Sequence, residues 1–443
     1  MPFPGSFIQM AASEAISDKF HAALRELYRL QRFGIKLELS TIRRMLAQLG
    51  NPQQTYAAVH IAGTNGKGSV AAALASILTS AGYRTGLYTS PHLVCFNERI
   101  CIDGRQVTDE EVLSAYRTVK QVDPGERQPT FFEYTTAMAL YLFAQRRVQW
   151  AVIETGMGGR LDATNVLAPA VTVITNVALE HRAYLGSRLA QIAAEKAGII
   201  KPQTPVITAV HQPAAIAVIE KTAAAKDAPL FRLKTHFGVR RSGNGTFCYR
   251  GMHHRWPAMH TPLQGGHQVE NAALTLAACE ILKNSGNRLP REAIRTGLAR
   301  TRWPGRLEIV RADPLVILDG AHNLIAARRL AGYLAAELKD RPVTLVAGIL
   351  DDKPYAAMLR CLVPLCRRIV LTRPVIDRAL PPSLLLREVK KLGAAATVIE
   401  AVPDAVHHAI TSAAPHGAVC VAGSLYTVGE ARQYLNVAGG RRA

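Results

Sequence analysis

The chain alternates short runs of Val, Ile and Ala with longer segments in which apolar residues recur at helical spacing. In the first half of the chain, the apolar runs lie at residues 57–61, 85–89, 151–154, 171–177 and 205–210. Continuous apolar runs of this length, separated by helices, are typical of strands buried on both faces of a parallel sheet. The pattern therefore predicts an α/β fold with a mostly parallel sheet that helices cover on both sides.

A second series of apolar runs occupies the C-terminal third of the chain. These runs lie at residues 316–319, 343–349, 368–372, 396–400 and 419–422. They predict a second, smaller α/β unit. Between the two series, residues 240–266 combine Gly, His and Arg with polar turn signals, which favours irregular or antiparallel structure, and residues 271–282 have a helical pattern.

The length of 443 residues exceeds what one hydrophobic core usually organises, so two domains of unequal size are expected. Pro304 and Gly305 both disfavour continuation of a helix and mark the junction. We therefore predict one domain at residues 1–302 and a second at residues 303–443.

Composition places the chain among globular proteins, since 49% of its residues are hydrophobic and 19% are charged. The first ten residues lack a basic stretch followed by an apolar run and a cleavage site, and no later apolar run approaches the length that spans a bilayer. The seven cysteines are scattered and lack the C-x-x-C spacing of metal ligands. The sequence thus predicts a cytoplasmic protein with reduced thiols and no membrane partner.

The formal net charge of +20 comes from 53 Lys and Arg against 33 Asp and Glu. Such a charge attracts polyanions. The basic residues are dispersed, however, and no basic segment is interleaved with aromatic residues in the way that base stacking requires. We therefore expect no nucleic-acid partner and favour anionic small molecules as ligands.

The strongest local signal is a glycine-rich loop between the first predicted strand and a helix expected to begin near Val70. The loop consists of Gly63, Thr64, Asn65, Gly66, Lys67, Gly68 and Ser69. Glycines let backbone N–H groups close around phosphates, the helix N-terminus adds a favourable dipole, and Lys67 would reach the terminal phosphates. The loop departs from the common phosphate-loop pattern because Gly68 separates Lys67 from Ser69. The alternative is a structural tight turn, but the order of strand, lysine and helix favours an ATP site, which kinases and helicases also use.

Further motifs follow in order along nearly the whole chain. They are GTNGKGS at residues 63–69, TSPHL at 89–93, FNERI at 96–100, FEY at 132–134, ETGMGGRLDATN at 154–165, EKAGI at 195–199, PGR at 304–306, DGAHN at 319–323 and GSLYTVG at 423–429. In this order they resemble the signatures of the dihydrofolate synthase/folylpolyglutamate synthase family of the Mur ligase superfamily. The resemblance implies a phosphate-loop ATPase domain at residues 1–302 and a smaller, Rossmann-like glutamate-ligase domain at residues 303–443.

The reaction implied by the resemblance is ATP-dependent ligation in two steps. The carboxylate of dihydropteroate or a folate attacks the γ-phosphate of ATP, and the amine of L-glutamate then displaces phosphate from the acyl phosphate to form an amide. Such chemistry needs charge neutralisation around the phosphates, so ATP and Mg²⁺ are the expected cofactors. The enzyme is expected to be a monomer. The alternatives are a folylpolyglutamate synthase without dihydrofolate synthase activity, a peptidoglycan-precursor ligase of the same superfamily, and a non-catalytic ATP-binding relative.

The resemblance also assigns residues around the nucleotide. The loop from Gly63 to Ser69 would hold the triphosphate with Lys67, while Asn271, Arg306 and Asp319 match residues that contact ATP. Ser90, Glu154 and His181 match the magnesium ligands, and Lys196 matches a lysine that carbon dioxide converts to a carbamate. Taken singly, each has an ordinary structural reading, such as a turn serine, a helix cap, a loop histidine or a solvated lysine.

For the pterin and glutamate substrates, the resemblance indicates Phe132, Glu133, Leu161, Asp162 and Ala163, together with residues 35–39. An aromatic ring such as that of Phe132 can stack on a pteridine, although it fits a hydrophobic core equally well. The chain departs from the family pattern at a few positions, which are Glu38, Glu180, Arg182 with Ala183, and Leu324 with Ile325. These departures put substrate preference in question and retain the predicted magnesium ligands.

Overall fold

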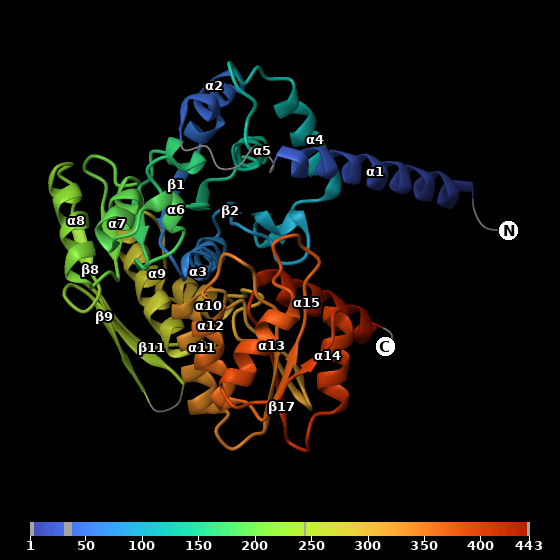
Figure 1. Ribbon diagram of the computed structural model, residues 1–443. Helices are drawn as coiled ribbons and strands as arrows, with labels where there is room; N and C mark the ends of the chain where they lie inside the picture. The colour runs from blue at the N-terminus through green and yellow to red at the C-terminus, as the bar shows by residue number, and fades with distance from the viewer. Residues whose placement is uncertain (1–3, 31–37, 243–244, 441–443) are drawn as a thin grey trace. The chain divides into compact units, whose positions relative to one another are not determined.

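The computed structural model of the protein describes residues 4–30, 38–242 and 245–440. The chain forms two compact units, and Figure 1 labels many of their elements. The N-terminal unit runs to Thr301 without two short segments, Leu93–Cys95 and Pro262–Gln268, which belong with the residues from Arg302 onward in the C-terminal unit. Within the described residues, no helix combines the length and the apolar character needed to cross a membrane.

An eight-stranded sheet forms the centre of the N-terminal unit, in the order β4-β3-β2-β5-β1-β6-β7-β8. Its strands are β1 (Ala57–Ala62), β2 (Thr85–Tyr88), β3 (Ile100–Ile102), β4 (Arg105–Gln106), β5 (Trp150–Glu154), β6 (Val171–Ile174), β7 (Val206–Thr208) and β8 (Leu230–Arg232). The six adjacent strands β2, β5, β1, β6, β7 and β8 pair in parallel, which confirms the predicted sheet, whereas β3 and β4 form an antiparallel edge. That edge was not predicted, because strands of two and three residues leave no apolar pattern.

Helices pack on both faces of this sheet. They are α1 (Pro4–Arg29), α2 (Ser40–Gln48), α3 (Lys67–Ser80), α4 (Asp109–Lys120), α5 (Phe131–Gln145), α6 (Arg182–Leu185), α7 (Leu189–Ala197), α8 (Pro213–Ala224), α9 (Gly266–Asn284) and α10 (Arg291–Ala299), with short 3₁₀ turns η2 (Pro52–Gln54), η3 (Phe96–Arg99) and η4 (Ala163–Val166). Successive residues of β1 face opposite sides, because side chains alternate along a strand. Val59 and Ile61 join the core with α3, α9 and α10, whereas Ala58 joins the core with α2, α4 and α5.

A small antiparallel sheet of β9 (Gly238–Arg241), β10 (Phe247–Arg250) and β11 (Arg255–Met259) follows, in the order β11-β10-β9. It confirms the expectation of antiparallel structure in this segment. Glu280 on α9 is fully buried and attaches to the turn between β10 and β11. Its carboxylate accepts hydrogen bonds from the Tyr249 hydroxyl at 2.7 Å and from the N–H groups of Met252 at 3.1 Å and His254 at 2.8 Å.

Glu280→Ala should lower the free energy of unfolding by about 3 kcal/mol, because it leaves several buried donors without an acceptor. Tyr249→Phe, which removes a single donor, should cost about 1 kcal/mol. Urea unfolding followed by circular dichroism measures both effects. Glu292→Ala, at an exposed position of α10, is the matched control and should leave the unfolding free energy nearly unchanged. Equal stability of Glu280→Ala and the control would contradict this account.

The C-terminal unit contains a six-stranded sheet in the order β12-β13-β17-β14-β15-β16. Its strands are β12 (Glu308–Ala312), β13 (Leu315–Leu318), β14 (Val343–Ala347), β15 (Arg368–Leu371), β16 (Thr397–Val398) and β17 (Ala418–Ala422), and its helices are α11 (Leu324–Glu337), α12 (Tyr355–Leu362), η5 (Val363–Leu365), α13 (Pro382–Lys391), α14 (Val402–Thr411) and α15 (Leu425–Gly440). Only β12 pairs antiparallel in this sheet. Ile317 and Leu345 pack with α11, α12 and α13, whereas Val316 and Val346 pack with α14 and α15. The second α/β unit is thus confirmed, and α14 lies beside β17 (Figure 1).

Candidate active site

The loops that carry most of the predicted site leave one edge of the N-terminal sheet. Strands β2, β5, β1 and β6 are adjacent and parallel, so their carboxyl ends share that edge. The phosphate loop follows β1, Ser90 lies two residues after β2, Glu154 ends β5, and the segment with His181 follows β6. Open α/β sheets bind ligands outside the carboxyl ends of their strands. The fold therefore gathers four separate predicted stretches at the position where a ligand site is expected.

The phosphate loop leads into α3, which begins at Lys67 rather than near Val70. Gly66 has a left-handed φ of 86°, and a Cβ at this position would lie 2.6 Å from Oδ1 of Asn271. The turn therefore requires glycine. It also places Asn271, a predicted ATP contact, beside the loop. Because the first N–H groups of a helix have no intrahelical partner, the start of α3 presents donors and a positive dipole to an anion.

Asn176, two residues after β6, fixes the loop from the neighbouring strand. Its Oδ1 accepts from the Asn65 N–H at 3.0 Å, its Nδ2 donates to the Asn65 carbonyl at 2.7 Å, and its own carbonyl accepts from the Thr64 N–H at 2.9 Å. The hydroxyl of Thr175 also donates to the Asn65 carbonyl at 2.7 Å. The amides of Thr64 and Asn65 are thus used within the protein, so we expect phosphate contacts to come from the first turn of α3.

Asn176→Ala should raise the KM for ATP about ten-fold while changing the KM for the predicted pterin substrate much less, because the loop backbone loses hydrogen bonds worth about 1 kcal/mol each. Steady-state kinetics with each substrate varied in turn measure the difference. Gln212→Ala is a suitable control, since Gln212 donates a hydrogen bond at 3.0 Å to the carbonyl of Val177, the residue after Asn176. An unchanged KM for ATP in Asn176→Ala would show that the hydrogen bonds from Asn176 to the phosphate loop do not support nucleotide binding.

Lys67 and Ser90 meet the same carboxylate. Nζ of Lys67 lies 3.7 Å from Oε1 of Glu154 and 3.4 Å from the Thr64 carbonyl. Oε2 of Glu154 accepts from the backbone N–H of Ser90 at 3.3 Å, and the Glu154 side chain is 5% exposed. The structure therefore brings the loop lysine and two of the three predicted magnesium ligands into one cluster of contacts.

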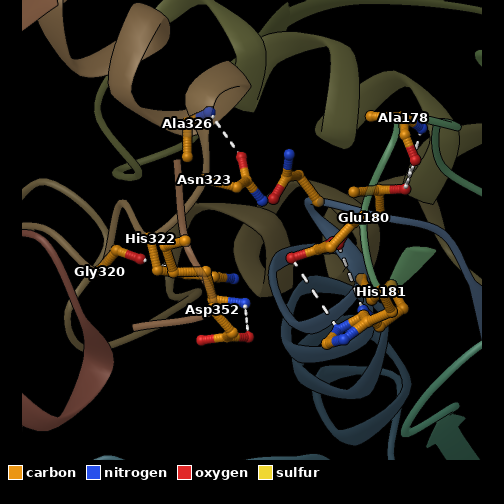
Figure 2. A network of polar contacts seen from close by, with 12 residues as sticks. Ala178, Glu180, His181, Gly320, His322, Asn323, Ala326 and Asp352 are labelled. Atoms are coloured by element: carbon orange, nitrogen blue, oxygen red, sulfur yellow. Dashed lines mark hydrogen bonds and ion pairs between the residues drawn. The ribbon is translucent and has the colours of Figure 1, made fainter. Parts of the chain in front are cut away.

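His181, the third predicted magnesium ligand, has a left-handed φ of 51° and directly precedes α6. Its Nε2 lies 4.0 Å from Oε1 of Glu180, one of the positions that depart from the family pattern (Figure 2). The side chain of Arg182, another departure, lies outside the described residues. In the described parts of the chain, no group of three or more His, Cys, Asp or Glu side chains forms a metal cluster. The predicted set contains two such side chains and a serine, a donor combination that fits a Mg²⁺ ion retaining water and phosphate oxygens.

Lys196 lies in the last turn of α7 and is 4% exposed, so it is not an ordinary solvated lysine. Burial and the nearby charge of Lys67 lower its pKa to about 7, against the opposing effect of Glu180 and Asp162. A large part of the amine is therefore unprotonated at neutral pH. An unprotonated amine is the form that reacts with carbon dioxide.

The lowered pKa of Lys196 also predicts a pH-dependent stability. Between the folded pKa of about 7 and the ordinary value of 10.5, the unfolded chain binds more protons at this residue than the folded chain. Lys196 therefore makes the free energy of unfolding rise with pH across this window. Urea unfolding of the parent and Lys196→Met in buffers free of carbon dioxide should show a smaller rise in the variant. Identical pH profiles would contradict the lowered pKa of Lys196.

Phe132, a predicted substrate residue, lies at the edge of the core. Its ring stacks on Tyr88 with centroids 6.1 Å apart, and the ring edge would lie 2.5 Å from a Cβ at Gly156. Phe131 is buried, whereas Phe132 is only partly buried. The two neighbouring aromatic residues thus separate into one core side chain and one that covers the glycine of the loop after β5.

Glu133 serves the start of α5. Its carboxylate accepts from the Thr130 N–H at 2.8 Å, and it accepts two hydrogen bonds from the guanidinium of Arg127 at 2.6 and 2.9 Å. Arg127 also pairs with Glu38, the departure in the segment 35–39, whose residues 35–37 lie outside the described residues. Arg127 was not predicted, because its partners lie 6 and 89 residues away in the sequence.

The other predicted substrate residues follow the loop after β5. Asp162 is buried, and its carboxylate accepts from the N–H groups of Met157 at 2.8 Å and Thr164 at 3.1 Å. Burial raises the pKa of Asp162, and these hydrogen bonds oppose the rise. Leu161 is half-buried and Ala163 is buried. Asp162 thus holds both ends of the loop that carries the predicted contacts.

In the C-terminal unit, Asp319 follows β13 and is buried. Its carboxylate accepts from the N–H groups of Leu307 at 2.9 Å and Ala321 at 3.0 Å. Burial raises the pKa of Asp319, and the charge of Arg306 opposes the rise. Arg306 itself donates to the carbonyl of Gly320 at 3.1 Å. Each of the two predicted residues, Arg306 and Asp319, therefore forms a hydrogen bond with the backbone next to the other one.

The residues after Asp319 form the start of α11. Oδ1 of Asn323 accepts from the Ala326 N–H at 2.9 Å, and Nδ1 of His322 lies 2.8 Å from the Gly320 carbonyl (Figure 2). Asn323 is thus a helix N-cap. The departure Leu324 occupies the first residue of the helix and leaves the cap in place.

Known proteins resemble the chain over nearly its whole length. Residues 61–279 match the Mur ligase middle domain, and residues 305–425 match the Mur ligase glutamate ligase domain. The dihydrofolate synthase/folylpolyglutamate synthase of Bacillus subtilis is 39% identical over 342 residues, which covers 74% of this chain and 79% of that protein. The structure of Escherichia coli FolC in complex with DHPP and ADP is similar, with a TM-score of 0.86, 32% identity, and coverage of 95% of this chain and 98% of that one. A bifunctional synthase from Yersinia pestis, complexed with AMPPNP and Mn ion, has a TM-score of 0.85 and 31% identity, covering 94% and 98% of the two chains.

Proposed function

Because the chain belongs to the dihydrofolate synthase/folylpolyglutamate synthase family of Mur ligases, we propose that it joins L-glutamate to dihydropteroate and to tetrahydrofolates at the expense of ATP. The observation that carries this proposal is the grouping of Lys67, Glu154 and Lys196 at the edge of the sheet where the phosphate loop follows β1. A phosphate-binding lysine, a buried carboxylate and a buried amine with a lowered pKa suit phosphoryl transfer to a carboxylate.

The ligation proceeds in two balanced steps. An oxygen of the substrate carboxylate forms a bond to the γ-phosphorus of ATP while the bond to the ADP oxygen breaks, which gives an acyl phosphate and ADP. The glutamate amine then bonds to the acyl carbon, the carbon–oxygen bond to phosphate breaks, and the amine loses a proton. Lys67 and the amides at the start of α3 hold the charge of the transferring phosphate throughout.

The residues around the nucleotide divide into metal and ATP contacts. Ser90, Glu154 and His181 would hold Mg²⁺, which when bound neutralises the negative charge of the phosphate oxygens. Asn271 contacts the nucleotide beside Gly66, and the close approach of these two residues supports the assignment. In the C-terminal unit, Arg306 and Asp319 contact ATP, and Arg306 suits two-point binding of phosphate.

Lys196 becomes a carbamate in the active enzyme. The unprotonated amine attacks the carbon of carbon dioxide, a nitrogen–carbon bond forms, and one proton is released, so that a cation is replaced by a carboxylate. Burial of Lys196 and the lowered pKa support this step. The resulting carboxylate would support a second Mg²⁺.

We assign these roles to two functional domains, residues 1–302 and 303–443, and the division of contacts between Thr301 and Arg302 supports the boundary. The enzyme acts as a monomer in the cytoplasm. The seven cysteines are all free thiols, which is usual in that compartment. Light scattering coupled to size-exclusion chromatography tests the monomer.

A direct assay tests which of the two proposed acceptor substrates the enzyme uses. The purified protein is offered ATP, Mg²⁺ and L-glutamate with dihydropteroate in one series and tetrahydrofolate in another, and products are identified by mass spectrometry. Both series should give the starting compound with one added glutamyl residue, with release of one phosphate for each residue added. Product from tetrahydrofolate alone would reduce the function to folylpolyglutamate synthase, and no product in either series would overturn the proposal.

A further inference from the structure

His60 lies at the centre of the N-terminal sheet and has no role in the site described so far. It is fully buried in β1, opposite Ile153 of β5 and Thr172 of β6. Its Nε2 lies 2.8 Å from Oγ1 of Thr164, and its Nδ1 has no hydrogen-bond partner among the described residues. A fully buried polar ring with one partner is costly to place in a core, which calls for a specific reason.

The hydrogen bonds around Thr164 have a fixed direction. Its hydroxyl donates to Oδ1 of Asp162 at 2.5 Å. A hydroxyl has a single proton, so the contact with His60 must be one in which Thr164 accepts from the Nε2–H of the ring. His60 is therefore the neutral tautomer with the proton on Nε2. Burial lowers its pKa to about 3, in agreement with a neutral ring.

At the other end of this chain of hydrogen bonds, Asp162 organises the loop after β5. Oδ1 accepts from the N–H and the hydroxyl of Thr164, and Oδ2 accepts from the N–H of Met157. Each carboxylate oxygen thus accepts a hydrogen bond from a backbone N–H group, as expected of an ionised group. The adjacent Gly156 lies under the ring of Phe132. The orientation of the carboxylate and the shape of this loop are therefore set together.

We propose that His60 is a positioning residue for pterin recognition, which acts through Thr164 to hold the Asp162 carboxylate in one orientation and in its ionised form. Hydrogen bonds in a buried series strengthen one another, and a donor to the hydroxyl makes that hydroxyl a better donor to the carboxylate. This inference rests on the proposed function, in which Asp162 contacts the pterin substrate. His60 and Thr164 are both fully buried, so both act on the substrate only through Asp162.

Two pairs of substitutions separate positioning from packing. Thr164→Val keeps the shape and removes the hydroxyl, whereas Thr164→Ser keeps the hydroxyl. His60→Leu removes the ring N–H, whereas His60→Gln retains an N–H donor at the end of the side chain. Thr164→Val and His60→Leu should raise the KM for dihydropteroate about ten-fold, with the KM for ATP unchanged, since a hydrogen bond to a charged group is lost or weakened. Thr164→Ser and His60→Gln should stay within about three-fold of the parent.

A parallel rise in all KM values, or an equal loss in the serine and valine variants, would overturn the proposal. The tautomer provides a readout that does not depend on any variant retaining activity. Long-range ¹H–¹⁵N spectra of the histidine-labelled parent, with His60 assigned by its loss in His60→Gln, should show the proton on Nε2. A proton on Nδ1 would reverse the direction of the hydrogen bonds and overturn the proposal even if Thr164→Val failed to fold.

Failure of the underlying function gives a different result. Asp162→Asn removes the charge at the substrate contact, so it should raise the KM for dihydropteroate by itself. If Asp162→Asn leaves this KM unchanged, Asp162 does not contact the pterin, and the assignment of the substrate site fails. If Asp162→Asn raises the KM but Thr164→Val does not, the substrate site stands and the positioning role of His60 and Thr164 is refuted.

Discussion

Lys67→Ala is expected to lower the rate of ligation about a thousand-fold or more, because it removes a charge aimed at the transferring phosphate. Lys67 is the first residue of α3, and its Nζ contacts the Glu154 carboxylate and a loop carbonyl rather than the hydrophobic core. The substitution should therefore change the fold very little. ATP-dependent formation of the glutamyl product, followed by mass spectrometry, measures the loss.

Two comparisons make this result specific. Lys221→Ala removes an exposed lysine from α8 and should retain the parent rate. Circular dichroism and urea unfolding should give nearly the same profiles for Lys67→Ala and the parent. Ligation within a few-fold of the parent rate would refute the phosphate-loop assignment.

Lys196→Ala is expected to lose ligation by about a hundred-fold or more, because the variant cannot form the carboxylate that supports the second metal ion. ATP binding should persist, since the phosphate loop is unchanged, and equilibrium dialysis with labelled nucleotide measures it. Formate or acetate added to the variant should restore part of the activity by occupying the vacant carboxylate position. Lys226→Ala, which removes another lysine with a lowered pKa, should neither lose activity nor respond to these acids.

Carbon dioxide gives an independent test of the same residue. Depleting dissolved carbon dioxide should lower the activity of the parent enzyme, and bicarbonate should restore it. The effect should be larger at pH values below the pKa of Lys196, about 7, where less of the amine is free to react. A fully active Lys196→Ala protein would leave Ser90, Glu154 and His181 as the whole of the proposed metal site.

The sheets could be predicted because their central strands are buried on both faces. Val59, Ile61, Val152 and Val173 lie in such strands, and all are core residues. The short strands β3 and β4 carry too few residues to form a pattern, whereas β16 lies within the predicted run at residues 396–400. The start of α3 was misplaced by three residues, because the left-handed turn at Gly66 ends the loop earlier than the apolar pattern indicates.

The site residues that lie in sequence motifs at the ends of strands could be predicted. Residues without a motif, whose contacts exist only in the folded protein, could not. Lys67 and Glu154 lie far apart in the sequence, but both follow the ends of parallel strands, so their meeting could be expected. Asn176 and Arg127 have no distinctive motif, and their roles depend on backbone groups or carboxylates supplied by other segments. The burial of Lys196 likewise depends on the packing of α7, whose sequence does not show that the amine faces inward.

Transfer of a labelled oxygen tests the central claim most directly. Dihydropteroate with ¹⁸O in its carboxylate is incubated with the enzyme, ATP, Mg²⁺ and L-glutamate, and the inorganic phosphate and the nucleotide product are analysed by mass spectrometry. Attack of the carboxylate on the γ-phosphorus transfers one carboxylate oxygen to phosphate for each amide bond formed. We therefore predict one ¹⁸O atom in the phosphate per glutamyl product, with ADP as the unlabelled nucleotide. Product formation with unlabelled phosphate, or with ¹⁸O in AMP, would contradict the acyl-phosphate mechanism.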